Sequence, residues 1–538
     1  MDSDKPLLRF RERHYLAALL GLTFIAILQI PTAPQLQNSK APGQVNAPAS
    51  PQPSIVSAEA TDRGSKPAFP AAGPRAVQTL VPTPPVHAPA RTSARQVPEV
   101  PDFPGAGFPP TLIHTRRRGE AIASLARHYL PQTSFMTVSE LEAALRESNG
   151  GKEGAFPKLG EQVIIPEILT SPIVERPVPI PRNYEVRAIY LTGYMAGSEH
   201  GIRLIRRWHA AGGNAIVFDI KDFDGLVNVT FSHRLAPKRR DAPIRNLPKF
   251  VRFLHSLDLH AIARIALFRD EHIAKIYPEL AVHSRHTGQA WRENGKLVWT
   301  DPSNPDVQVY NLALAKEVAA SGVDEIQFDY VRFPAEGDQR DARFAFQSTH
   351  PEWDRSDVLS DFLSRTFAEL HPLGVLVSLD VFGVMAWQRP LDLRHTGQDI
   401  AAMAQFCDVL SPMIYPSHFF GMDGYARPGD APEHFIGKSM TQFGEITANS
   451  QVVLRPWLQA FAWRTKTYSP AYIRTQVKTA KQTGGVGFLF WNARNDYSKL
   501  FLAMTEMRSG GGESLSGGGA QNHSAAKAEQ TVAKQPAQ

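Results

Sequence analysis

Hydrophobic and polar positions alternate most clearly over residues 323–334, which predicts a β-strand. One face carries Ile326, Phe328 and Tyr330, and the other carries Gln327, Asp329 and Val331. Pro334 ends the strand, because proline has no N–H for a ladder hydrogen bond. This pattern is typical of a (β/α)8 barrel strand that packs on helices and ends in a carboxylate. The alternative is a surface strand whose Asp329 is only solvated.

Seven further segments between residues 187 and 508 also favour strands, and helical patterns separate them. The eight strand candidates are 187–194, 214–220, 260–267, 324–331, 375–381, 408–415, 452–459 and 485–491. The helical patterns cover 202–211, 305–322, 357–370, 399–406 and 470–482. The order predicts an α/β protein with a (β/α)8 TIM barrel over 187–508. Asn294-Gly295 predicts a hairpin turn inserted between the third and fourth strands.

The N-terminal 110 residues lack this periodicity. Lys5, Arg9, Arg11 and Arg13 precede an uncharged run over residues 15–30, which predicts a basic stub and an uncleaved membrane anchor within 1–35. A cleaved signal peptide is the alternative. Residues 36–110 are rich in Pro and Ala and predict an extended linker, and the Gly- and Ser-rich residues 509–538 predict a disordered tail.

A small unit is predicted over residues 111–168, followed by a proline-rich linker over 169–186. A short strand at Ile113, helices near residues 120 and 138, and a closing strand before Pro166 give the order β-α-α-β. The stretches 118–126, 148–150 and 159–166 resemble a LysM module, whose family binds glycans that contain N-acetylglucosamine. The alternative is a small structural spacer.

Composition narrows the class of protein. The 538 residues exceed one ordinary core, and 43% hydrophobic with 20% charged residues suits a globular protein. The net charge of +6 favours contact with anionic surfaces such as phospholipid or acidic polysaccharide. Cys407 is the single cysteine, which excludes an intrachain disulfide and a cysteine-cluster metal site. We expect no cofactor, no metal and no nucleic-acid partner.

Polar and aromatic residues recur at the C-terminal ends of the predicted strands, where barrel enzymes build their sites. Asp329 and Asp380 are the leading catalytic pair and Asp219 is next, because glycosidic cleavage needs a proton donor and a second carboxylate. Asp219 has the alternative of only pairing with Lys221 or Arg264. The residues predicted to bind substrate are Lys221, Asp222, Arg264, Trp299, Gln327, Arg332, Tyr415, Trp457, Gln459 and Trp491. Any single Trp has core packing as its alternative role.

Five motifs in order across residues 187–497 resemble a bacterial family of inferred glycoside hydrolases, related to larger glycosidase groups with (β/α)8 barrels. They are Asp219-Ile220-Lys221-Asp222, Trp299-Thr300-Asp301-Pro302, the stretch 328–334, the stretch 411–416 and Phe490-Trp491-Asn492. The resemblance implies polysaccharide hydrolysis. Chitinase-like barrels end the fourth strand with a glutamate acid, and Asp329 or Tyr330 stands there in this chain.

The sequence therefore predicts a glycosidase tethered to the bacterial inner membrane, with its barrel outside the cytoplasm, or secreted if the N-terminal segment is cleaved. Its substrate would be a cell-envelope or exported polysaccharide, such as peptidoglycan or an exopolysaccharide. A catalytically inactive glycan-binding scaffold is the second hypothesis. Metal-dependent deacetylation is a weak third, because the sequence has no HExxH motif.

Overall fold

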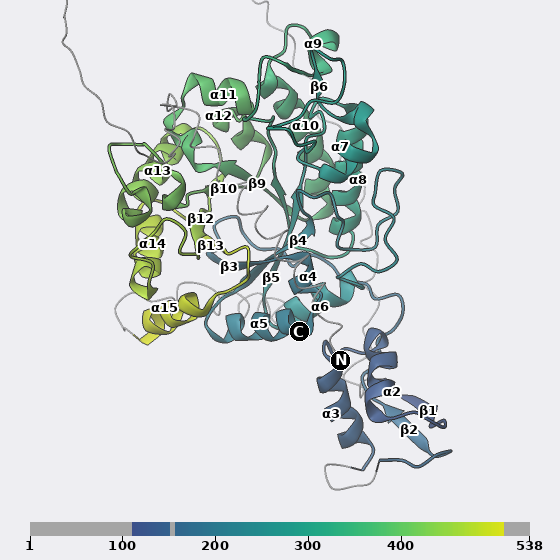
Figure 1. The fold of residues 1–538 in the computed structure, drawn as a ribbon. Coiled ribbons are helices and arrows are strands. Elements are labelled where there is room, and N and C mark those ends of the chain that lie inside the picture. The colour runs from purple at the N-terminus through teal and green to yellow at the C-terminus, as the bar shows by residue number, and fades with distance from the viewer. Residues whose placement is uncertain (1–109, 151–155, 510–538) are drawn as a thin grey trace, which may run out of the picture. The chain divides into compact units, whose positions relative to one another are not determined.

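The structure is a computed structural model that describes residues 110–150 and 156–509 (Figure 1). The predicted membrane segment, the long linker and the C-terminal tail lie outside the described residues. Within the described ranges, no helix combines the length and the hydropathy that a membrane span requires.

The small N-terminal unit has the predicted β-α-α-β order. It consists of β1 (Leu112–Thr115), α2 (Ile122–Tyr129), η1 (Leu130–Gln132), α3 (Val138–Ser148) and β2 (Gln162–Ile165). The two strands pair antiparallel, with Leu112 opposite Ile165. Thr137 caps α3 in a reciprocal arrangement with Glu140, which satisfies free N–H groups at the helix start. The similarity of this unit to a LysM module stays a prediction.

The large unit is a closed parallel barrel with eight strand positions, as the sequence predicts. The strands are β3 (Val186–Leu191), β4 (Ala215–Lys221), β5 (His260–Ala266), β7 (Glu325–Asp329), β9 (Leu376–Phe382), β10 (Val409–Met413), β11 (Val453–Leu454) with β12 (Trp457–Gln459), and β13 (Gly487–Trp491). The pairing of β9 with β10 closes the sheet. The seventh position is split at Arg455-Pro456, because proline cannot donate to the ladder.

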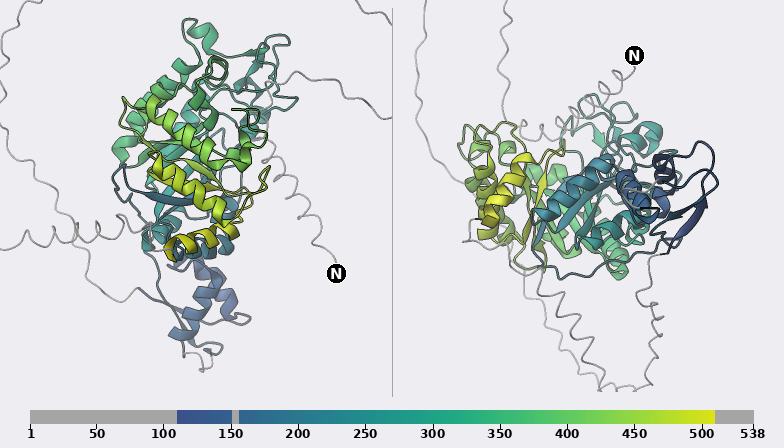
Figure 2. Two further views of the ribbon diagram at one scale, coloured as in Figure 1. Left: turned by 90° about the vertical axis from the view of Figure 1, so that its left-hand side faces the viewer. Right: turned by 90° about the horizontal axis from the view of Figure 1, so that it is seen from below.

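Helices surround the strands (Figures 1 and 2). They are α4 (Gly193–Ala196), α5 (Glu199–Ala210), α6 (Leu247–Ser256), α7 (Glu271–Ile276), α8 (Pro305–Ala319), α9 (Phe346–Thr349), α10 (Arg355–Leu370), α11 (Pro390–Thr396), α12 (Ile400–Met403), α13 (Pro432–Ile446), α14 (Pro470–Gln482) and α15 (Ser498–Ser509). Short 3-10 turns are η2 (Pro278–Leu280), η3 (His371–Leu373), η4 (Gly383–Trp387), η5 (Ala404–Phe406), η6 (Pro416–His418) and η7 (Pro428–Asp430). The first barrel strand is shorter than predicted, because Thr192 caps α4 and Tyr194 lies in that helix.

Each barrel strand presents one face to the helices and the other to the barrel interior. Ile326 and Phe328 belong to the large core between strands and helices. A second, smaller core fills the interior with side chains that include Val217, Tyr190 and Leu489. Because successive side chains alternate, the polar residues on the interior face of β4, β7 and β9 converge at the strands' C-terminal ends.

A β-bulge interrupts this alternation in β4. Asp219 pairs with Arg264 and Lys221 pairs with the next residue of β5, Ile265, so Ile220 has no partner. The extra residue turns Lys221 outward. Its ammonium group binds Asp270 at 2.9 Å and Asn311 of α8 at 2.8 Å, and the side chain is fully buried.

The chain between β5 and β7 is long, and it includes the predicted hairpin turn. Asn294 and Gly295 both have positive φ, +49° and +82°, as such a turn requires, and Glu293 faces Lys296 across it. The short pair β6 (His283–Ser284) and β8 (Ala342–Arg343) joins this insertion to the loop that follows β7. These two loops lie beyond the C-terminal ends of β5 and β7.

Candidate active site

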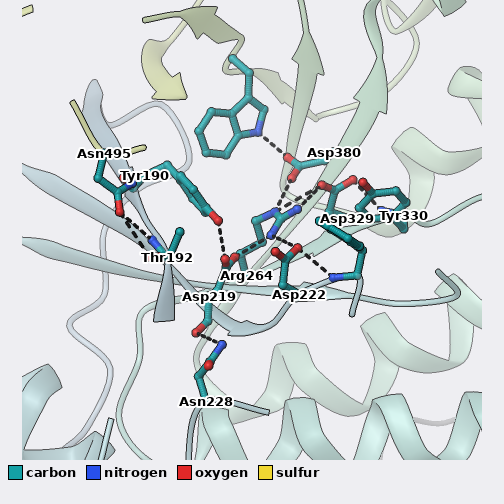
Figure 3. Close-up of polar contacts among 12 residues, drawn as sticks. Tyr190, Thr192, Asp219, Asp222, Asn228, Arg264, Asp329, Tyr330, Asp380 and Asn495 are labelled. Atoms are coloured by element: carbon teal, nitrogen blue, oxygen red, sulfur yellow. Dashed lines mark hydrogen bonds and ion pairs between the residues drawn. The ribbon is translucent and has the colours of Figure 1, made fainter. Parts of the chain in front are cut away.

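Arg264 organises the candidate site, which brings together four carboxylates from the ends of three strands, β4, β7 and β9 (Figure 3). Its Nη1 donates to Asp219 at 2.5 Å and to Asp222 at 3.4 Å. Its Nη2 donates to Asp329 at 2.6 Å, and its Nε lies 3.9 Å from Asp380. Arg264, Asp219, Asp329 and Asp380 are all less than 9% exposed. We call Arg264 and the four aspartates, Asp219, Asp222, Asp329 and Asp380, the carboxylate cluster.

Asp329 has the contacts of an ionised carboxylate. Its Oδ2 accepts hydrogen bonds from Nε and Nη2 of Arg264, at 3.2 and 2.6 Å, and its Oδ1 accepts one from the backbone N–H of Tyr330 at 2.6 Å. Tyr330 has a φ of +52°, an uncommon conformation for a bulky residue. Backbone strain of this kind concentrates at functional sites, and here it directs the Tyr330 N–H toward the carboxylate.

The environment of Asp380 differs from that of Asp329, because it disfavours the charged form of the carboxyl group. Its Oδ1 accepts a hydrogen bond from the indole N–H of Trp457 at 2.7 Å, and its buried Oδ2 has no hydrogen-bond partner among the described residues. Burial, reinforced by the negative charge of Asp329, raises the pKa of Asp380 well above the usual range of an aspartate. This environment therefore favours the protonated form of Asp380.

Asp219 forms a third part of the cluster, together with Tyr190. The Tyr190 hydroxyl donates to Asp219, and Asn228 donates to the backbone carbonyl of Asp219 at 3.3 Å. Burial raises the pKa of Asp219 to about 8, although Arg264 opposes this shift. Burial also disfavours the charge of Arg264, but Asp219, Asp329 and Asp222 outweigh it and raise the Arg264 pKa well above its usual range.

The cluster can therefore supply the two carboxyl groups that glycosidic cleavage requires. Asp329 accepts hydrogen bonds from the Arg264 guanidinium, whereas burial favours the protonated form of Asp380, and the two residues lie on neighbouring strands β7 and β9. Their nearest oxygens both lie within 3.9 Å of Nε of Arg264. Acid chemistry at neutral pH needs a carboxyl group whose pKa is raised in this way.

Three of the predicted aromatic residues lie beside this cluster. Tyr415 and Trp491 have ring centroids 5.8 Å apart, and Trp491 lies 6.4 Å from Tyr190. Trp491 is half-buried, whereas Tyr415 and Trp457 are 3% and 2% exposed. Trp491 thus keeps accessible ring surface, while Trp457 holds Asp380.

The side chains of the other predicted binding residues make their contacts outside the cluster. Lys221 faces the helices, behind the β4 bulge. Gln327 is fully buried and donates to Ser411 inside the barrel at 3.4 Å, and Gln459 donates to Thr465 and Phe461. Trp299, 1% exposed, lies beneath the guanidinium of Arg332.

Two residues near the site were not among the predicted site residues. Tyr190 lies on the interior face of β3 and contacts Asp219. Arg269 follows β5 by three residues, as Arg332 follows β7, and that shared offset from the strand ends is the signal that could have found it. A cavity of about 250 Å³ lies elsewhere, against α6 and α8, and no residue of the carboxylate cluster lines it.

An eight-stranded parallel barrel with buried carboxylates at the C-terminal ends of its strands is an arrangement that many barrel enzymes share, glycosidases among them. The family DUF4015, described as "Putative glycosyl hydrolase domain", matches residues 188–497, which is more than half of the chain, and the chain belongs to this family. A search of curated proteins finds no match.

Solved structures that match this chain include a hypothetical protein, a glycoside hydrolase domain and a spore cortex-lytic enzyme. A hypothetical protein from Ruminiclostridium thermocellum ATCC 27405 is 32% identical, covering 36% of this chain and 97% of that one, with a TM-score of 0.32. The PgaB (BpsB) glycoside hydrolase domain from Bordetella bronchiseptica is 15% identical, covering 60% and 99%, with a TM-score of 0.46. The spore cortex-lytic enzyme SleL from Bacillus megaterium QM B1551 is 12% identical, covering 73% and 86%, with a TM-score of 0.37.

Proposed function

We propose that this protein is a glycosidase that cleaves glycosidic bonds of a cell-envelope or exported polysaccharide. Asp380 is the proton donor to the leaving oxygen, and Asp329 is the second carboxylate, acting as nucleophile or as base for water. The observation that carries this assignment is the contrast between the two groups. Arg264 and the Tyr330 N–H hold Asp329 as a carboxylate, whereas burial holds a proton on Asp380.

The remaining cluster residues have supporting roles in this proposal. Arg264 orients Asp329 and balances the negative charge of the site. Trp457 positions Asp380 and leaves its Oδ2 free to donate the proton. The accessible ring surface of Trp491 stacks on the apolar face of a sugar ring.

The test uses the full-length chain on a panel of peptidoglycan, chitin, starch and acidic exopolysaccharide, with release of reducing ends as the readout. Asp329→Asn and Asp380→Asn are each expected to lower turnover by at least about 100-fold. Asp241→Asn, at an exposed position, is the matched control and should leave turnover unchanged. If the Asp329→Asn variant keeps wild-type turnover on any member of the panel, the assignment of Asp329 as a catalytic carboxylate is wrong.

Aryl glycosides with good leaving groups separate the two roles, because such leaving groups need no protonation. Asp380→Asn should regain most of its activity on such a substrate, and Asp329→Asn should not. If both variants recover equally, the roles of the two residues are not those proposed.

A glycan-binding scaffold with an inactive barrel is the second candidate. It is favoured by the complete pairing of Asp329, whose two oxygens already accept three hydrogen bonds. It requires saturable binding of a polysaccharide without release of reducing ends at high protein concentration.

The location outside the cytoplasm belongs to the same proposal. It is supported by the basic flank and apolar run of residues 5–30 and by the Pro- and Ala-rich stretch after them, which gives the barrel reach from a membrane. The LysM-like unit would add a second contact with glycan. Protease accessibility of the barrel in intact spheroplasts tests the location, since a protected barrel would contradict it.

A further inference from the structure

Two arginines occupy matching positions just beyond the ends of neighbouring barrel strands. Ala266 and Asp329 are in register at the ends of β5 and β7, and Arg269 and Arg332 each follow three residues later. Both guanidinium carbons lie 5.6 Å from the centroid of the same ring, that of Tyr330. The pair is thus connected to Asp329 through the residue that follows it.

Neither arginine has an acidic partner. Arg269 and Arg332 are 8% and 5% exposed, and no ion pair among the described residues includes either of them. The side chain of Arg269 makes no hydrogen bond within the described part of the chain, and its Nη1 is buried without a partner. The Arg332 side chain donates only to the backbone carbonyl of Phe333, at 3.0 Å. Several N–H groups of two buried cations are therefore unused.

Aromatic rings hold both guanidinium groups in place. Arg269 lies 4.4 Å from the ring of Phe223, and Arg332 lies 4.6 and 4.3 Å from the rings of Trp299 and Phe382. Stacking of this kind uses the flat face of a guanidinium and leaves the N–H groups at its edge available. Such stacking compensates only part of the cost of burying an unpaired charge.

Two glutamates face the same region without neutralising it. Glu293 and Glu336 are near enough to influence the pKa of Arg332, but neither forms an ion pair with an arginine. Burial and the charge of Glu293 raise the pKa of Glu336 to about 7, although Arg332, Arg269 and Lys296 oppose this shift. Glu271 and Asp222 also lie near enough to Arg269 to raise its pKa. Protonation of Glu336 below about pH 7 removes one negative charge from beside Arg332.

We propose that Arg269 and Arg332 bind an anionic group of the glycan, a carboxylate, phosphate or sulfate, on a sugar next to the bond that the carboxylate cluster acts on. The substrate is then an acidic polysaccharide. Planar guanidinium forks bind such groups through paired hydrogen bonds. The identity of the polymer rests on the proposed function, whereas the binding of the anion does not.

The test measures binding to the full-length protein by calorimetry at pH 6 and low salt. The probes are methyl glucuronide, methyl glucoside 6-phosphate, methyl glucoside 6-sulfate and neutral methyl glucoside, which share a ring and differ in charge. We expect at least one anionic probe to bind at least about tenfold tighter than the neutral one, and the tightest identifies the source of the anion. Arg269→Met and Arg332→Met should each remove this preference, and Arg340→Met, at an exposed position of the same loop region, should retain it.

Equal binding of all four probes would overturn the proposal, as would an anion preference that persists in the double Met variant. If a Met variant fails to fold, Arg269→Lys and Arg332→Lys serve instead, because they keep the charge and lose the fork. Those variants should fold and weaken anion binding several-fold, and unchanged binding would count against the proposal. Failure of hydrolysis across the polysaccharide panel would refute the glycosidase and leave this binding result intact.

Discussion

Buried arginines have different partners in two regions of the molecule. One region is the carboxylate cluster around Arg264, and the other is the pair Arg269 and Arg332 beside Tyr330. Arg264 donates four hydrogen bonds to Asp219, Asp222 and Asp329. Arg269 and Arg332 lie at the same end of the barrel, yet they contact rings instead of carboxylates. Arg264 finds its acidic partners within the protein, whereas Arg269 and Arg332 obtain theirs from a ligand in our proposal.

This difference separates residues that hold the site together from residues that recognise what enters it. Burying a charge costs several kcal/mol unless a partner compensates. Arg264 has that compensation in the unliganded protein, whereas Arg269 and Arg332 have only part of it.

Replacing Arg264 should damage the protein far more than replacing Arg269. Arg264→Met leaves Asp219 and Asp329 buried without a counter-charge, and we expect it to lower the free energy of unfolding by about 3–5 kcal/mol. Arg269→Met removes an unpaired charge and keeps the apolar contact with Phe223, so its effect should lie within about 1 kcal/mol of zero or be stabilising. Urea unfolding of both variants measures the difference, and equal losses would break the comparison.

The pH dependence of hydrolysis should have an alkaline limb set by Asp380. Burial raises the pKa of this acid, and the acid loses its proton as the pH rises through that pKa, so kcat/KM should then fall. Asp219, whose pKa is about 8, is the other group that could cause the alkaline limb. If Asp380 causes it, the Asp219→Asn variant should still show the limb. An alkaline limb that disappears in Asp219→Asn would transfer the acid role to Asp219.

Removing the indole N–H that contacts Asp380 should alter the acid more than the binding of substrate. That N–H lowers the Asp380 pKa, so Trp457→Phe should move the alkaline limb up by about one pH unit and lower kcat with little change in KM. Trp291→Phe, which removes an N–H bonded to a loop carbonyl, is the control. A lower kcat with an unmoved limb would show that Trp457 is only a packing residue.

The smallest effect should come from Glu336, which opposes anion binding. At pH 8 this carboxyl is mostly ionised and at pH 5.5 it is mostly neutral, because its pKa is about 7. Glu336→Gln should therefore tighten the binding of the anionic probes about three- to fivefold at pH 8 and change it little at pH 5.5. Glu352→Gln, on the surface, should change neither value. An equal gain at both pH values would place the cause elsewhere.

Much of the barrel could be predicted from local sequence. Alternation over 324–331 assigned Ile326 and Phe328 to the helix-facing core, where the structure has them. Asn304 caps α8 and Pro305 opens it, in agreement with the predicted start of that helix. Such features depend on neighbours in the chain, so a single sequence contains them.

The site depended on relations between strands that local patterns do not contain. Trp457 was predicted to stack on sugar, but its strand lies beside β10, which places its N–H against Asp380 of β9. Lys221 was predicted to reach substrate by counting alternate residues from Asp219, and the bulge at Ile220 reverses that count. The residue types along the chain predict neither which strands lie side by side nor where the bulge occurs.

The bulge at Ile220 also places the adjacent residues Lys221 and Asp222 on different sides of the strand. The Lys221 side chain faces the helices and binds Asp270 and Asn311, and Asp222 contacts Arg264. Without the bulge, Ile220 would pair with Ile265, and Lys221 and Asp222 would exchange faces, which would place an ammonium group where the carboxylate of Asp222 lies. The sign of the charge at this end of the barrel therefore depends on the pairing register of β4 as well as on its residue types.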